Sequence, residues 1–331
     1  RFTWESKNNN GPLYTMFQVN NHDTSDKQFS EFYGNKIIKG RVGEDGKYEL
    51  DECLDMILAT DECALYLSRR LYQFFCFPEI TESVETNIIS PMAEILRNNN
   101  YELSAPLKAL LGSAHFYDIS FYSSMIKSPM DYVLNLKKTF RYNIKNYNNP
   151  NDIPPKIRDE KTQGFYFYRG IGWATGDQGQ SFFNPPNVSG WPAFYQEPVY
   201  DLYWINSDSI AKRANHGNGF GDWGDWLANG TSGGNVHLKI DPIHFISIIS
   251  EPENIDVLIS ETILQFTSVE IPSITYNRIK NSILQGANQQ HFKDLVNAIK
   301  NGGTTDQINE LSGRLTKMFK AIFQLAEVQL F

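Results

Sequence analysis

The sequence predicts a mainly α protein: a multi-helical single domain with a small mixed amino-terminal portion and a long aromatic insertion rich in Gly, Pro and Asn. Three observations lead to this prediction. Apolar residues recur at spacings of three and four from about residue 50 onward, as they do in helices with one buried face. Several Ser-Pro and Asp-Pro pairs have the form of helix starts. Between the helical segments, aromatic residues cluster with glycine, proline and asparagine without any helical period.

Residues 1–50 contain short strand-like pieces, at Tyr14–Val19 and Lys36–Lys39, separated by turn residues, so we expect a mixed strand and loop portion there. From residue 51 to residue 331 we expect a helical domain, which opens with two consecutive helices. The apolar positions on which these two helices are predicted, and which we expect to be buried, are Leu54, Ile57, Leu58, Leu65, Leu67, Leu71, Phe74 and Phe75.

Further helix starts are marked by Ser90-Pro91, Ser128-Pro129 and Asp241-Pro242. Each pair places an N-cap side chain before a proline at the first helical position. Proline is tolerated there because the N–H that it lacks would have no partner within the helix. Lys127, Ser128 and Asp131 look like a charged cluster. Asp131, however, falls at the third helical position, where a carboxylate reaches back to the cap, so helix initiation explains the cluster. With a looser variant at Ser104, these marks predict helices near residues 91–98, 105–112, 129–142 and 242–250.

The expected insertion covers about residues 143–236. Its first part, Tyr142–Gly164, is polar and typical of an exposed loop, and the aromatic part that follows contains only a short helical candidate at Ile205–Ala214. Long loops are uncommon in compact proteins unless they serve a site or an interface, so we expect function here. After it, helices are predicted near residues 255–266, 271–284, 291–299 and 312–330.

Charge and composition exclude some classes of protein. The 30 basic and 38 acidic side chains give a net charge of −8, which disfavours binding to nucleic acid or to anionic lipid. No run of about 18 apolar residues is present, so no membrane span is expected. Cys53, Cys63 and Cys76 are odd in number and lack metal-ligand spacing, so we expect buried free thiols.

One candidate site lies in NNHDTSDKQ, where His22 and Asp23 are followed by Asp26. An imidazole and two carboxylates in a turn could hold a divalent metal, or His22 and Asp23 could act as an acid and base pair. The alternative is a plain turn, because Asp and Asn side chains bond to nearby backbone. No cofactor is predicted apart from this divalent metal.

A second candidate region contains the stretch GQSFFNPPNVSGWP, at Gly179–Pro192. Its prolines stiffen the backbone, so we expect a shaped loop in which Phe182, Phe183 and Trp191 are buried anchors. A binding-cleft wall is the second interpretation. The candidate ligand-binding residues of this region are Asn187, Trp191, Trp204, Asn206, Trp223 and Trp226.

The run GNGFGDWGDW, at Gly217–Trp226, lacks the lysine and the glycine spacing of a phosphate loop, so we expect an aromatic turn. Its two indoles could stack on a sugar while the neighbouring carboxylates accept hydroxyl protons, or they could anchor the turn. Glycoside hydrolysis requires two facing carboxylates. The acids available for it in this region are Asp201, Asp208, Asp222 and Asp225.

The strings LSRRLYQFF (Leu67–Phe75), LKALLGSAHFYD (Leu107–Asp118), IKSPMD (Ile126–Asp131) and FFNPPNVSGWP carry a family resemblance. With them in order along most of its length, the chain resembles the bacterial family called domain of unknown function 1800, in particular its Bacteroidetes-type members. In the family, two glycines and soon afterwards a tryptophan commonly follow Gly-Trp-Pro. This chain departs from that pattern, because AFYQEPVYDLY (Ala193–Tyr203) stands between Pro192 and Trp204.

This resemblance implies an exported protein of the periplasm or cell envelope, a missing amino-terminal part, and a sulfatase-like protein as neighbour; it implies no chemistry. We therefore expect an accessory protein that binds envelope or extracellular polysaccharide, with a glycan as partner. One alternative is a hydrolase that uses loop carboxylates with His22 and Asp23. The other is a scaffold for the sulfatase-like partner.

Overall fold

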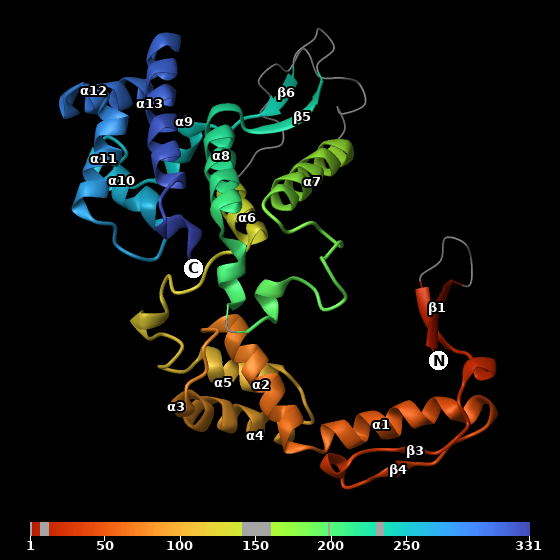
Figure 1. Cartoon of the computed structure of the whole chain (residues 1–331). Helices are drawn as coiled ribbons and strands as arrows, with labels where there is room; N and C mark the ends of the chain where they lie inside the picture. Colours follow the sequence, from red (N-terminus) through yellow and green to blue (C-terminus); the bar gives the residue numbers. More distant parts are fainter. Residues whose placement is uncertain (1, 7–12, 141–159, 198, 230–234) are drawn as a thin grey trace. The chain divides into compact units, whose positions relative to one another are not determined.

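The computed structural model of the chain describes residues 2–6, 13–140, 160–197, 199–229 and 235–331 (Figure 1). The protein is mainly α, as the helical spacing predicts. It divides into two compact units, Arg1–Tyr117 and Asp118–Phe331, which are described separately. The expected boundary near residue 50 differs from this division, because the helices after it pack with each other in the first unit. Among the described residues no helix is both long and apolar enough to cross a membrane.

The amino-terminal unit combines two antiparallel strand pairs with a group of helices. β1 pairs with β2, and β3 pairs with β4 in the register Lys27↔Ile38. A single π-helical stretch, Glu85–Ile89, continues into α4, so Ser90 lies inside the helix and is not its cap. The elements of this unit are β1 (Phe2–Ser6), β2 (Leu13–Phe17), β3 (Lys27–Gln28), β4 (Ile37–Ile38), α1 (Tyr48–Leu58), α2 (Asp61–Phe75), α3 (Glu82–Val84), α4 (Ser90–Asn98) and α5 (Ser104–Leu111).

The core of this unit lies between α2, α4 and α5, where Tyr72, Ile89 and Met92 are buried. The Tyr72 hydroxyl lies 3.1 Å from His115 Nε2, so a hydrogen bond ties His115 to this core. Two helices were correctly predicted at α1 and α2, but the expected burial of Leu54, Leu58, Phe74 and Phe75 was wrong. All four side chains are exposed. The two leucines are exposed because α1 turns its other face toward the strands.

The carboxy-terminal unit packs helices around a large aromatic core. Phe140, at the end of α6, lies between 4.8 and 6.0 Å from the ring centroids of five other phenylalanines. In Figure 1, α8 runs alongside α13, and the two are in contact. The elements are α6 (Pro129–Thr139), α7 (Glu160–Asp177), the 3-10 helix η9 (Tyr200–Trp204), α8 (Ser207–Trp223), β5 (Asp225–Asn229), β6 (Asn235–Leu238), α9 (Pro242–Phe245), α10 (Ile255–Leu264), α11 (Ser273–Leu284), α12 (Gln289–Lys300) and α13 (Thr305–Phe323).

Local signals located most of these helices correctly. Ser128 accepts a hydrogen bond from the Asp131 N–H over 3.2 Å, and Asp241 accepts one from the His244 N–H over 2.9 Å, so both are N-caps as predicted. The Asp131 carboxylate accepts from the Ser128 hydroxyl over 2.6 Å. The helix expected near 242–250 is shorter, since α9 ends at Phe245 and a 3-10 turn follows.

The expected insertion is the part of the chain where prediction failed. α7 occupies Glu160–Asp177, and α8 extends through Gly217–Trp223, which had been predicted as an aromatic turn. A Cβ on Gly217 would lie 3.0 Å from Phe323 Cβ, so this glycine allows α8 to approach α13 closely. Packing between the two helices therefore overrides the low helix propensity of the glycines. The loop predicted at Tyr142–Gly164 lies outside the described residues except for the start of α7.

Candidate functional sites

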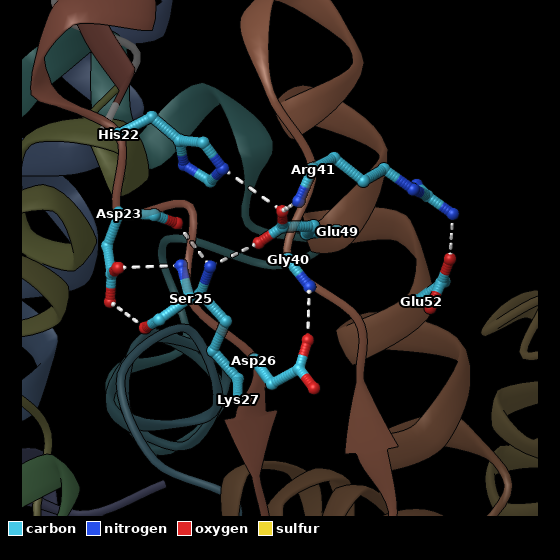
Figure 2. Close-up of polar contacts among 9 residues, drawn as sticks. All are labelled: His22, Asp23, Ser25, Asp26, Lys27, Gly40, Arg41, Glu49 and Glu52. Atoms are coloured by element: carbon cyan, nitrogen blue, oxygen red, sulfur yellow. Dashed lines mark hydrogen bonds and ion pairs between the residues drawn. The ribbon is translucent and has the colours of Figure 1, made fainter.

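The amino-terminal unit contains a polar cluster around the carboxylate of Glu49 (Figure 2). His22 Nε2 lies 3.0 Å from Glu49 Oε1, and Lys27 Nζ lies 2.7 Å from Glu49 Oε2. The backbone N–H of Arg41 donates to Oε1 over 2.6 Å. Burial raises the pKa of Glu49, but the hydrogen bonds from Lys27, Arg41 and His22 outweigh it and hold this pKa below its ordinary value. Glu49 is therefore a buried, fully paired carboxylate.

The two aspartates predicted beside His22 are used in other contacts (Figure 2). Asp23 accepts hydrogen bonds from the Ser25 N–H and the Ser25 hydroxyl, each over 2.9 Å, which form an Asx turn. Asp26 lies 2.6 Å from Lys39 Nζ and accepts from the Gly40 N–H over 3.0 Å. The Ser25 contacts lower the pKa of Asp23, and the Lys39 and Gly40 contacts lower the pKa of Asp26.

His22 thus pairs with Glu49, 27 residues away, and not with its sequence neighbours. A carboxylate that orients an imidazole is an arrangement found in general bases, but this ring is buried and its edge meets Phe17 at a centroid distance of 5.1 Å. Within the described ranges, no three His, Cys, Asp or Glu side chains form a group that could hold a metal ion. The metal site at His22, Asp23 and Asp26, and the acid and base pair, stay predictions.

In the carboxy-terminal unit, motif residues from distant parts of the sequence meet at the start of α6. The backbone N–H of Ile126 donates to Asp201 Oδ2 over 2.7 Å, although 75 residues separate them. The N–H of Met130 donates to the side-chain oxygen of Gln180 over 2.8 Å. Asp201 is buried, and burial raises the pKa of its carboxyl. The stretch IKSPMD is therefore fixed by side chains from η9 and from the loop that follows α7.

Two buried cations complete this network; sequence reasoning assigned Lys127 to helix initiation and did not single out Arg213. Lys127 Nζ donates to the carbonyls of Phe266 and Val328, each over 3.0 Å. Arg213 donates to Gln329 Oε1 over 3.1 Å and to the Lys127 carbonyl over 2.9 Å. Burial lowers the pKa of Lys127 to about 8 and that of Arg213 to about 10. The partners of Arg213 are 86 and 116 residues away, and no local spacing signals such a pairing.

The loop Gly179–Pro192 is held at its base and exposed at its tip. Phe182 packs against the core, and Asn187 Nδ2 donates to the Tyr195 hydroxyl over 2.9 Å. Phe183 and Val188, in contrast, are fully exposed. The predicted burial of Phe183 was therefore wrong, because this residue takes the left-handed conformation, with φ of 55°, and points away from the core.

Four of the six candidate ligand-binding residues have structural contacts. Asn187 braces the loop, and Asn206 caps α8 by accepting hydrogen bonds from two backbone N–H groups over 3.0 and 2.9 Å. Trp204 is buried against Phe194 at 5.4 Å between ring centroids, and Trp191 is half-buried. A ligand role for them stays a prediction, and the contacts described above are with other parts of the protein.

The remaining two candidates lie at the end of α8 and in β5. Trp223 is 58% exposed, and its ring centroid lies 6.4 Å from that of His237. Trp226 pairs with His237 in the β5–β6 register, and its side chain lies outside the described part of the structure. Asp222, expected to assist the indoles, lies 2.6 Å from Lys320 Nζ. Trp223 is thus a candidate that presents an indole to solvent.

A second exposed indole, which sequence reasoning did not single out, lies on α7. Trp173 is 54% exposed, and the Arg169 guanidinium lies over its ring, 4.2 Å from the centroid. Arg169, Trp173 and Asp177 follow at intervals of four and share one face of α7. Asp177 lies 3.6 Å from Lys212 Nζ on α8, so the two helices are linked at this face.

A family model with the description "Protein of unknown function (DUF1800)" matches residues 2–330. The chain belongs to the DUF1800 family. No curated protein sequence and no solved structure matches it. In this DUF1800 protein the stretches that carry the resemblance include IKSPMD and the loop with Gly179–Pro192, which meet where Met130 donates to Gln180.

Proposed function

We propose that this DUF1800 protein is an exported accessory protein that binds envelope or extracellular polysaccharide, using exposed indoles on α7 and α8. The observation that carries the proposal is the exposure of Trp173 and Trp223 on helices that the core holds in place. Half-exposed indoles offer a flat apolar face on which a sugar ring stacks, while neighbouring polar groups bind its hydroxyls. Export rests on the family resemblance alone.

The surface beside Trp223 suits an extended ligand. Asn215, Gly219 and Trp223 follow at intervals of four along α8 and therefore share one face. A Cβ on Gly219 would meet nothing within 4 Å, so the helix surface next to the indole is open backbone. Asn215 is exposed and brings an amide that both donates and accepts. These are the groups that hydroxyl recognition requires.

The surface on α7 adds charge to the second indole. Arg169 places a guanidinium beside Trp173, and Asp177 with Lys212 supplies a carboxylate and an ammonium one helical turn further. Sugar hydroxyls, carboxylates and sulfates are all bound by such groups. A panel of ligands should therefore contain neutral, uronic and sulfated polysaccharides.

The test is calorimetric titration of that panel into the wild type and into Trp173→Ala and Trp223→Ala. We expect each substitution to weaken binding about tenfold, since stacking on one indole contributes about 1 kcal/mol or more. Phe32→Ala is the matched control, because Phe32 is 63% exposed but lies in the amino-terminal unit. Failure of every polysaccharide to bind, or unchanged affinity in the double variant, would overturn the proposal.

The two alternatives stay predictions with their own tests. A hydrolase that uses His22 and Asp23 should lose turnover in Asp23→Asn. Among the loop acids, Asp201 accepts the Ile126 N–H and Asp208 lies 2.9 Å from Lys212 Nζ, so these carboxylates already have partners. A scaffold for a sulfatase-like protein should co-elute with it on a sizing column.

A further inference from the structure

Helix α1 buries one of its faces within the amino-terminal unit. On the inner face, Glu49 and Met56 are buried, and Glu49 makes the contacts with His22 and Lys27 described above. The same face lies against β4, whose Ile38 is buried. The inward contacts of α1 are therefore made by this side, and at the end of the helix the Leu58 carbonyl also accepts a hydrogen bond from the Tyr101 hydroxyl over 2.5 Å.

The outer face carries a continuous apolar stripe. Leu50, Leu54 and Leu58 follow at intervals of four, so they lie in one row along the helix, and they are 44%, 47% and 39% exposed. Leu54 is two positions before Met56, which places the two side chains about 200° apart around the helix axis. Single exposed leucines are common on protein surfaces, but a row of three on one helix face marks an interaction surface.

Acidic side chains run beside this stripe. Asp51 and Asp55 follow Leu50 and Leu54, are exposed, and form no ion pair within the described residues. α1 contains four acidic residues and no lysine or arginine between Tyr48 and Leu58. A partner that covers the leucines must therefore also meet unpaired negative charge, and a basic partner does so favourably.

We propose that the outer face of α1 is a docking surface for a basic amphipathic helix of a partner protein. The partner helix would place aliphatic side chains at intervals of three and four against Leu50, Leu54 and Leu58, as helices that dock through an apolar face do. Its lysines or arginines would face Asp51 and Asp55. A second copy of α1 fits poorly, because it would set unpaired carboxylates against each other.

The experiment measures fluorescence anisotropy of a labelled, designed helical peptide of about 18 residues, built from leucine and lysine, titrated with the full chain. A peptide of the same composition in scrambled order is the control for charge alone. We expect saturable binding of the helical peptide only. Leu54→Ser should weaken peptide binding about five- to tenfold, since the peptide covers this half-exposed leucine in the complex. The double variant Asp51→Asn with Asp55→Asn should also weaken peptide binding and should reduce the dependence of the affinity on salt.

Two matched variants serve as controls. Leu264 on α10 is 68% exposed and Glu94 on α4 is exposed, so Leu264→Ser and Glu94→Gln should bind the peptide as the wild type does. No saturable binding, or equal binding by the α1 variants, would overturn the proposal. A dimer in sedimentation analysis that Leu54→Ser dissociates would also overturn it, in favour of a second copy. The aspartate variants leave the apolar surface intact, so they test the proposal independently of folding.

Discussion

The close packing of α8 on α13 makes a prediction that two glycines of one helix can test. Gly217 and Gly219 both lie in the last turns of α8. Replacing a helical glycine by alanine stabilises a helix by about 1 kcal/mol, because the alanine backbone loses less conformational freedom on folding. Gly219→Ala should gain this amount in full, since its Cβ would meet nothing within 4 Å.

Gly217→Ala should behave in the opposite way. Its Cβ would lie 3.0 Å from Phe323 Cβ and 3.0 Å from the Tyr132 hydroxyl, which donates to the Arg213 carbonyl. Overpacking of this kind costs about 1–3 kcal/mol, so the helix gain is cancelled or exceeded. The free energies of unfolding of the two variants should therefore differ by about 1–3 kcal/mol.

Urea unfolding followed by tryptophan fluorescence measures this difference, and thermal unfolding provides a second readout. For a unit of this size each kcal/mol shifts the melting temperature by about 2–4 °C, so the two variants should be clearly separated. Equal stability of Gly217→Ala and Gly219→Ala would refute the reasoning, because it would mean that α8 does not approach α13 closely at Gly217. The order of the variants is more informative than either absolute value.

Three further predictions follow from the buried and capping groups. The pKa of Glu49 is held below its ordinary value of 4.5 in the folded state, so the ionised carboxylate stabilises the fold above pH 4.5. This stabilisation is lost as the pH falls through the folded-state pKa. In Glu49→Gln, the free energy of unfolding measured in urea should therefore depend less on pH on the acid side. Burial lowers the pKa of Lys127 from 10.5 to about 8, so between these pH values the unfolded chain binds more protons than the folded one. The free energy of unfolding should therefore rise with pH across this window, and the rise should be absent in Lys127→Met. Asn206→Ala should lower stability by about 1 kcal/mol through loss of the α8 cap, while glycan affinity per folded molecule stays that of the wild type if Asn206 has no ligand role.

Local sequence signals were sufficient where a helix start depends on its own neighbours. Ser128 and Asp241 were predicted as caps because the bonds that they make reach only three residues along the chain. α10, α11 and α12 were located to within two residues at each end by apolar spacing for the same reason, since one helix face is a local pattern. α13 was expected at residues 312–330 but spans Thr305–Phe323, so its existence was predicted and its bounds were not. The family could also be predicted, because its motifs are short strings, and the family model confirmed it.

The candidate sites could be predicted only in part. Trp223 was interpreted either as a sugar-stacking indole or as an anchor of the turn, and it is exposed; Trp173 was missed because nothing in α7 was predicted as helix. His22 was identified, but its partner Glu49 is 27 residues away on α1 and no spacing rule connects them. The sequence can therefore identify a candidate side chain such as His22, but it does not identify the residues that this side chain contacts in the fold.

The sequence by itself determined the helical character, the positions of most helix starts and the membership of the DUF1800 family. Only the tertiary structure decided that Gly217–Trp223 is helical, that Leu54 and Phe183 are exposed, and that Lys127 meets Arg213 in one buried network. The physical reason is the range of the interactions. Capping and periodicity act within one or two helical turns, whereas burial and the pairing of buried charges depend on which distant segments the fold brings together.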